Sequence, residues 1–163
     1  MGLQQEEIFA LAHETILVVD DSPSNLSLTR ALLDKAGYRT QGASAAEEAI
    51  RYLSSDAAMP HLILMDIHLP GMDGLALTKA IKSDPATRGI TIVAITGFAL
   101  NGEEDRARAA GCDDLIAKPV SARTLLAIVA YHLGRRTEAA QAVIPRGVDD
   151  PARRKTMRPS GPA

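Results

Sequence analysis

The sequence predicts an α/β protein built on one doubly wound, five-stranded parallel sheet. Between residues 15 and 134, short apolar runs alternate with longer stretches that have the spacing of amphipathic helices. The first, third and fourth runs are nearly continuously apolar and do not alternate apolar with polar residues. A strand needs that composition when helices cover both of its faces, as they do in a parallel sheet.

Five strand-and-helix units can be placed along this region. The expected strands are residues 16–19, 38–42, 61–65, 90–95 and 115–117, and the expected helices are residues 24–35, 44–53, 73–82, 101–110 and 121–133. Gly37, Gly111 and Gly134 each follow one of these helices, where glycine commonly ends a helix. Ser44 is expected to cap the second helix, with Glu47 three residues later completing a capping box.

Composition divides the chain into three parts and excludes several classes of protein. Residues 1–14 form an N-terminal extension, residues 15–134 one domain, and residues 135–163 a basic tail with few large apolar residues, which we expect to be disordered. The formal net charge of −2 gives no reason to expect nucleic-acid binding. No apolar run approaches the roughly 20 residues of a membrane helix. The start is too polar for a signal peptide, so we expect a cytoplasmic protein with no membrane contact.

Polar side chains follow four of the expected strands at the point where each strand ends. Asp20 and Asp21 follow the first strand, Asp66 the third, Thr96 the fourth and Lys118 the fifth. In doubly wound sheets, ligands bind beyond the carboxyl ends of the strands. Three carboxylates gathered there repel one another, so we expect a cation to hold them, and oxygen ligands suit Mg²⁺. A hydroxyl and an ammonium beside them suit the oxygens of a phosphoryl group.

A carboxylate can itself act as a nucleophile and form an aspartyl phosphate. Asp66 is the best candidate because the loop after it contains Gly71 and Gly74. Such a loop can turn tightly and leave the end of the strand open.

Four segments at these strand ends resemble the receiver domain of two-component response regulators. They are residues 16–21 (ILVVDD), 64–74 (LMDIHLPGMDG), 95–97 (ITG) and 117–119 (AKP), which stand in the family's order and spacing. The resemblance covers about residues 15–134 and implies a flavodoxin-like fold with strand order 2-1-3-4-5. Residues 98–104 and 111–114 further resemble single-domain regulators of the DivK type.

The resemblance implies a role for each site residue. Asp66 would be the phosphoacceptor, supplied by a histidine kinase or a histidine phosphotransfer protein. Asp21 and Asp66 would bind Mg²⁺ directly, together with the backbone carbonyl of His68, and Asp20 would act mainly through water.

The same resemblance assigns the groups around the phosphoryl oxygens. Thr96 would hydrogen-bond to the phosphoryl group, and Lys118 would pair with its charge. The Lys118–Pro119 peptide bond is expected to be cis.

The chain departs from the family at one position. Receivers usually carry Tyr or Phe three residues before the lysine, and here that residue is Leu115. We therefore expect the signal to pass mainly through the loop 97–100, where Phe98 is an aromatic residue. The resemblance implies an unknown downstream partner on the face formed by the helix 101–110, the strand 115–117 and the final helix, and homodimer formation is left open.

The leading interpretation is a signalling switch and not an enzyme, and two alternatives stay open. The chain could be the receiver portion of a hybrid histidine kinase. It could also be an Mg²⁺-dependent phosphatase with an aspartate nucleophile, although such enzymes carry Asp-x-Asp on the first strand and this chain has adjacent Asp20 and Asp21.

Overall fold

The computed structural model describes residues 14–97 and 102–134, so the predictions for the N-terminal extension, for Phe98 and for the basic tail lie outside the described residues. The strands are β1 (Thr15–Val19), β2 (Arg39–Ala43), β3 (Leu62–Asp66), β4 (Thr91–Thr96) and β5 (Asp114–Ala117). The helices are α2 (Pro23–Lys35), α3 (Ala46–Leu53), α4 (Gly74–Ser83), α5 (Glu103–Ala110) and α6 (Ala122–His132). All strand pairs are parallel, in the order β2-β1-β3-β4-β5, which confirms the predicted fold.

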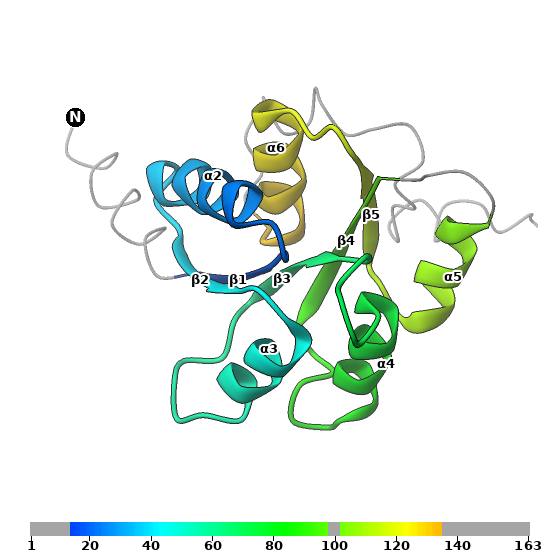
Figure 1. Cartoon of the computed structure of the whole chain (residues 1–163). Coiled ribbons are helices and arrows are strands. Elements are labelled where there is room, and N and C mark those ends of the chain that lie inside the picture. The colour runs from blue at the N-terminus through cyan, green and yellow to red at the C-terminus, as the bar shows by residue number, and fades with distance from the viewer. Residues whose placement is uncertain (1–13, 98–101, 135–163) are drawn as a thin grey trace, which may run out of the picture.

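Helices cover both faces of the sheet (Figure 1). Helices α2 and α6 pack on one face, and α3, α4 and α5 pack on the other. Along β1, Ile16 and Val18 contact the α2 and α6 side, while Leu17 and Val19 contact the α3 and α4 side. All four side chains are buried, which explains why this strand is apolar throughout.

The start of α3 differs from the predicted capping box. The N-cap lies one residue later than expected, at Ala45, so the third helical position is Glu48 and not Glu47. Glu48 accepts hydrogen bonds from the backbone N–H of Ser44 at 2.9 Å and from its hydroxyl at 3.0 Å. The predicted partner was therefore wrong by one position. The backbone bond from Ser44 lowers the pKa of Glu48.

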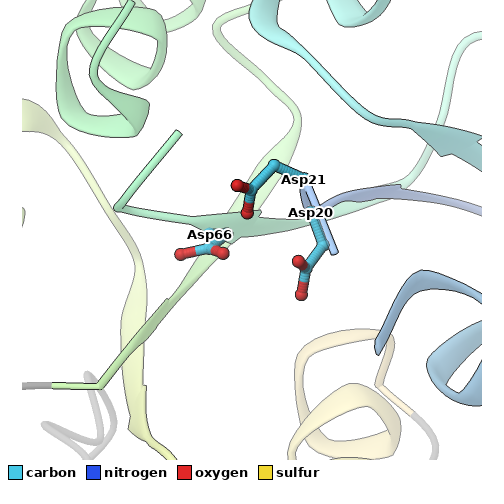
Figure 2. Close-up of side chains that lie close together, drawn as sticks. All are labelled: Asp20, Asp21 and Asp66. Atoms are coloured by element: carbon cyan, nitrogen blue, oxygen red, sulfur yellow. The ribbon is translucent and has the colours of Figure 1, made fainter. Parts of the chain in front are cut away.

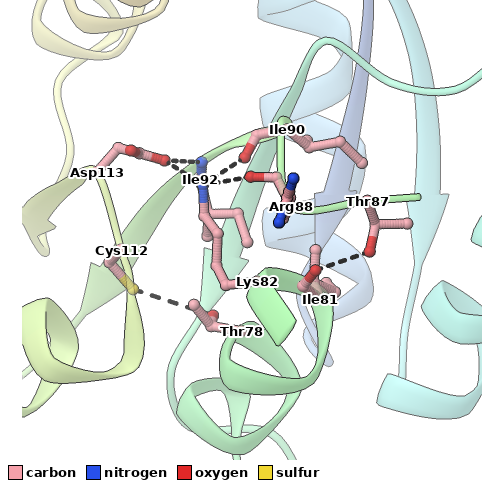
Figure 3. Close-up of polar contacts among 9 residues, drawn as sticks. All are labelled: Thr78, Ile81, Lys82, Thr87, Arg88, Ile90, Ile92, Cys112 and Asp113. Carbon is pink, nitrogen blue, oxygen red and sulfur yellow. Dashed lines mark hydrogen bonds and ion pairs between the residues drawn. The ribbon is translucent and has the colours of Figure 1, made fainter. Parts of the chain in front are cut away.

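A polar network fixes the end of α4 to the sheet (Figure 3). The ammonium of Lys82 donates to the carbonyl of Ile90 at 2.7 Å and forms an ion pair with Asp113 at 2.9 Å. The same carboxylate oxygen of Asp113 accepts the backbone N–H of Ile92 at 2.8 Å. The last turn of α4 is thereby tied to the beginning of β4 and to the turn before β5.

The beginning of α4 lies directly against the end of β3. The backbone N–H of Gly74 donates to the carbonyl of Ile67 at 3.0 Å. A Cβ atom at residue 74 would lie 2.2 Å from the carbonyl oxygen of Asp66 and 2.9 Å from the Cα of Ile67. Only glycine permits this approach, and the approach sets the backbone that carries Asp66.

We predict that Gly74→Ala destabilises the protein by roughly 1–3 kcal/mol, because the added methyl group forces the loop away from β3. Gly89→Ala is the matched control, since a Cβ there meets nothing within 4 Å. The free energy of unfolding from urea denaturation measures both effects. Equal stability of the two variants would show that the contact between Gly74 and β3 does not constrain the fold.

Candidate functional site

The register of the sheet brings the predicted site residues to one edge. Val19 pairs with Met65 and Asp66 with Ile95, while Thr96 pairs with Ala117. Each polar residue ends its strand or follows it directly, so the four strand ends β1, β3, β4 and β5 open on the same side. Asp20, Asp21 and Lys118 therefore lie close to Asp66, and Thr96 ends the neighbouring strand.

Three carboxylates converge at this edge (Figure 2). One carboxylate oxygen from each of Asp20, Asp21 and Asp66 lies within 4.8 Å of the others. Asp66 is 3% exposed and Asp20 is 6% exposed, whereas Asp21 faces solvent. Two of the three charges are thus removed from water, which makes their mutual repulsion costly.

The electrostatic cost is visible at Asp20. Burial raises the pKa of its carboxyl group, and the nearby carboxylates of Asp66 and Asp21 raise it further. The backbone N–H of Ser22, which donates to Asp20 at 2.9 Å, and the charge of Lys118 act in the opposite direction and lower the pKa. Burial and the neighbouring carboxylates together therefore disfavour the charged form of Asp20.

Asp66 lies between two donors. Its Oδ1 accepts the backbone N–H of His68 at 3.0 Å, and its Oδ2 is 3.3 Å from the ammonium of Lys118. The Lys118–Pro119 peptide bond is cis, as predicted. These contacts hold the Asp66 carboxylate at the end of β3. It lies beside Lys118, the one cation that the sequence predicted at this edge.

The hydroxyl of Thr96 has a partner that sequence reasoning missed. Thr96 is fully buried, and its Oγ1 donates to Oε2 of Glu103 at 2.7 Å. The other oxygen of Glu103 lies 3.0 Å from Nε2 of His68. Glu103 is 3% exposed, although it stands in the acidic first turn of α5, where glutamates are usually solvated. The sequence gives no signal that separates it from the neighbouring acids.

The donor set fits a hard divalent cation. Carboxylate oxygens in a cluster with excess negative charge are the ligands that Mg²⁺ takes, usually with retained waters. Asp20, Asp21 and Asp66 would hold the ion, which would neutralise charge on a transferring phosphoryl group. A carboxylate beside an ammonium and a hydroxyl, all at one strand edge, has the groups needed to accept and hold a phosphoryl group.

The sequence matches the profile of the response regulator receiver domain over residues 16–130. The chain belongs to the response regulator receiver family. As a receiver it is a component of two-component signalling, a family in which phosphorylation on aspartate and Mg²⁺ binding at the acidic site are typical.

Curated relatives and solved structures agree with this assignment. The receiver is 37% identical over 124 residues to the polar-differentiation response regulator DivK of Brucella ovis, covering 74% of this chain and 97% of DivK. It is 32% identical to the receiver domain of the sensor histidine kinase PA1611 of Pseudomonas aeruginosa, whose structure has a magnesium ion coordinated in the active site cleft, with a TM-score of 0.68 over 75% of this chain and 98% of that one.

A third similar structure is the receiver domain of a signal transduction histidine kinase from Syntrophus aciditrophicus. It is 34% identical, with a TM-score of 0.69 over 77% of this chain and 95% of that one.

In residues 14–97 and 102–134 of the present receiver, no helix is long and apolar enough to cross a membrane.

The departure at Leu115 is accommodated in a small apolar cluster. Leu115 is half-buried and packs against the cluster of Ile67, Ala94 and Ala107, between the end of β3, the middle of β4 and α5. A branched aliphatic side chain fills this place without any polar group of its own.

We predict that Mg²⁺ raises the melting temperature, because a ligand that binds only the folded state stabilises it by mass action. Asp21→Ala should reduce this shift more than Asp20→Ala, since Asp21 is open to solvent and Asp20 already accepts from the backbone of Ser22. Thermal melts with and without Mg²⁺ measure the shift. Asp56→Ala, which removes an exposed acid elsewhere, is the control. The reverse ranking would exchange the direct and water-mediated roles.

Proposed function

We propose that Asp66 is the phosphoacceptor of a signalling switch. One of its carboxylate oxygens attacks the phosphorus of a phosphohistidine, so that an oxygen–phosphorus bond forms as the nitrogen–phosphorus bond breaks. The histidine nitrogen leaves with the electron pair. The supporting observation is the place of Asp66 itself, buried at the end of β3 between Lys118 and two further carboxylates.

The other site residues complete this proposal. Lys118 pairs with the charge of the phosphoryl oxygens, and Thr96 donates its hydroxyl to one of them. Asp21, Asp66 and the backbone carbonyl of His68 bind Mg²⁺ directly, and Asp20 binds it through water. The protein then acts as a switch whose partners change with phosphorylation, and not as a metabolic enzyme.

The phosphodonor is a protein, a histidine kinase or a histidine phosphotransfer protein. An apolar hollow of about 500 Å³ lies between α2 and the start of α6, and Asp20 and Lys118 line it on the side of the site. Leu28 of α2 also lines this hollow and is 62% exposed. An exposed leucine in a hollow that reaches Asp20 and Lys118 suits the apolar face of a donor that must bring its histidine to Asp66.

The remaining assignments follow from the same proposal. Residues 15–134 form the receiver domain, residues 1–14 and 135–163 lie outside it, and the protein acts in the cytoplasm. The downstream partner binds the face formed by α5, β5 and α6. This face suits a partner because α5 and β5 lie next to Thr96 and Lys118 at the site.

We predict that Asp66→Asn abolishes phosphorylation by acetyl phosphate with Mg²⁺, because the amide is not a nucleophile for this reaction. Radiolabel incorporation or intact mass measures the phosphoryl group. Asp56→Asn should label as the wild type does. Full labelling of Asp66→Asn would place the phosphoacceptor elsewhere.

We predict that Leu28→Glu slows phosphotransfer from a phosphorylated histidine kinase by roughly tenfold, because it places an unpaired charge in an apolar contact with the donor. Labelling by acetyl phosphate, which needs no docking surface, should be unchanged. Ile50→Glu is the matched control, because Ile50 is 41% exposed and lies on α3 across the sheet. Profiling against a panel of kinases identifies the donor. If Leu28→Glu and Ile50→Glu transfer equally well, the donor docks on another surface.

A further inference from the structure

We propose that Glu103 is a positioning residue that competes with the phosphoryl group for the hydroxyl of Thr96. This inference rests on the proposed function, in which Thr96 donates to a phosphoryl oxygen on Asp66. The inference gives Glu103 a role, although Glu103 is not one of the groups that would bind Mg²⁺ or the phosphoryl group. It also identifies the start of α5 as the first element to respond to the phosphoryl group.

The competition follows from the chemistry of the hydroxyl. A threonine hydroxyl has one hydrogen to donate, and in this structure it is given to Oε2 of Glu103 at 2.7 Å. Because Glu103 accepts that hydrogen, a second acceptor can take it only by displacing Glu103. When Thr96 donates to a phosphoryl oxygen, its bond to Glu103 must lengthen or break.

Breaking this bond has a cost that forces Glu103 to move. Glu103 is 3% exposed, and a buried carboxylate that loses a donor is strongly disfavoured unless it finds another. Within the described part of the chain, Glu103 keeps the contact with Nε2 of His68 at 3.0 Å. His68 belongs to the loop that follows Asp66, so Glu103 connects the loop after β3 with the end of β4.

The structure provides a place for the released carboxylate. A hollow of about 260 Å³ lies between the loop after β3 and α5, and Glu103, His68, Asp73 and Arg106 are among the residues that line it. Arg106 can offer the carboxylate a positive partner at this wall. Because Glu103 is the first residue of α5, this side chain links Thr96 to the start of that helix.

The test uses the full chain with beryllofluoride, a phosphoryl mimic, and Mg²⁺. Glu103→Gln keeps the shape of the side chain but weakens its hold on Thr96, since a neutral acceptor forms a weaker bond than a carboxylate. We expect it to bind beryllofluoride roughly fivefold more tightly than the wild type, measured by NMR titration. Glu104→Gln is the matched control for charge, because it removes one negative charge from the same helical turn at an exposed position.

A double-mutant cycle separates the hydrogen bond from long-range charge. In the Thr96→Val background there is no hydroxyl to compete for, so Glu103→Gln should change the affinity no more than Glu104→Gln does. Glu103→Asp provides a second variant, because it keeps the charge but shortens the reach to Thr96. It should also tighten binding, whether or not Glu103→Gln folds.

The outcomes are distinguishable. Equal affinities of Glu103→Gln and Glu104→Gln in a wild-type background that binds beryllofluoride overturn this inference alone. An equal gain from Glu103→Gln with and without the Thr96 hydroxyl also overturns it, because the effect is then one of charge. If the wild type itself does not bind beryllofluoride with Mg²⁺, the proposed function fails and this inference fails with it.

Discussion

The site depends on the common direction of the five strands. Because every pair is parallel, the carboxyl ends of β1, β3, β4 and β5 open at one edge of the sheet. Helices on both faces require apolar side chains within the strands, so charged groups can appear only where the strands end. The packing that stabilises the core thus gathers Asp66 and its neighbours in one place, and it buries Asp66 without closing the edge of the sheet.

The clustering of carboxylates at this edge of the sheet lowers the stability of the folded protein. Among the residues that the structure describes, three carboxylates gather beside the ammonium of Lys118, which lies 3.3 Å from Asp66. The raised pKa of Asp20 reflects the free energy spent in burying a carboxyl group among like charges. Local arrangements that cost stability persist where function needs them, and a cation that binds here returns part of that cost. The acidic edge is therefore best understood as a binding site and not as a stabilising feature.

Most of the fold could be predicted from the sequence, because its signals are local. The apolar runs identify buried strands, and the polar residues after them mark the sheet edge. The features that could not be predicted depend on where each helix begins and on which of its side chains turn toward the sheet. Because α3 has its N-cap at Ala45, Ser44 bonds to Glu48 and not to Glu47, and the sequence pattern does not distinguish these two glutamates.

Glu103 was missed for a similar reason. It stands among Glu104 and Asp105 in the acidic first turn of α5, where all three residues look like ordinary solvated acids. Which of them turns inward is set by the orientation of α5 against β4, and that orientation is a tertiary property. For His68 a role was predicted only for the backbone carbonyl, whereas Nε2 of its side chain lies 3.0 Å from Oε1 of Glu103.

The two helices beside the site differ in how they are held, and this has a mechanical consequence. Helix α4 is attached at both ends, by the close approach of Gly74 to β3 and by the contacts of Lys82 with β4 and Asp113. The start of α5 is attached through a carboxylate whose donor, Thr96, is itself a site residue. A change in the hydrogen bond of Thr96 would therefore act on the start of α5, while the contacts of Lys82 would hold the end of α4 against the sheet.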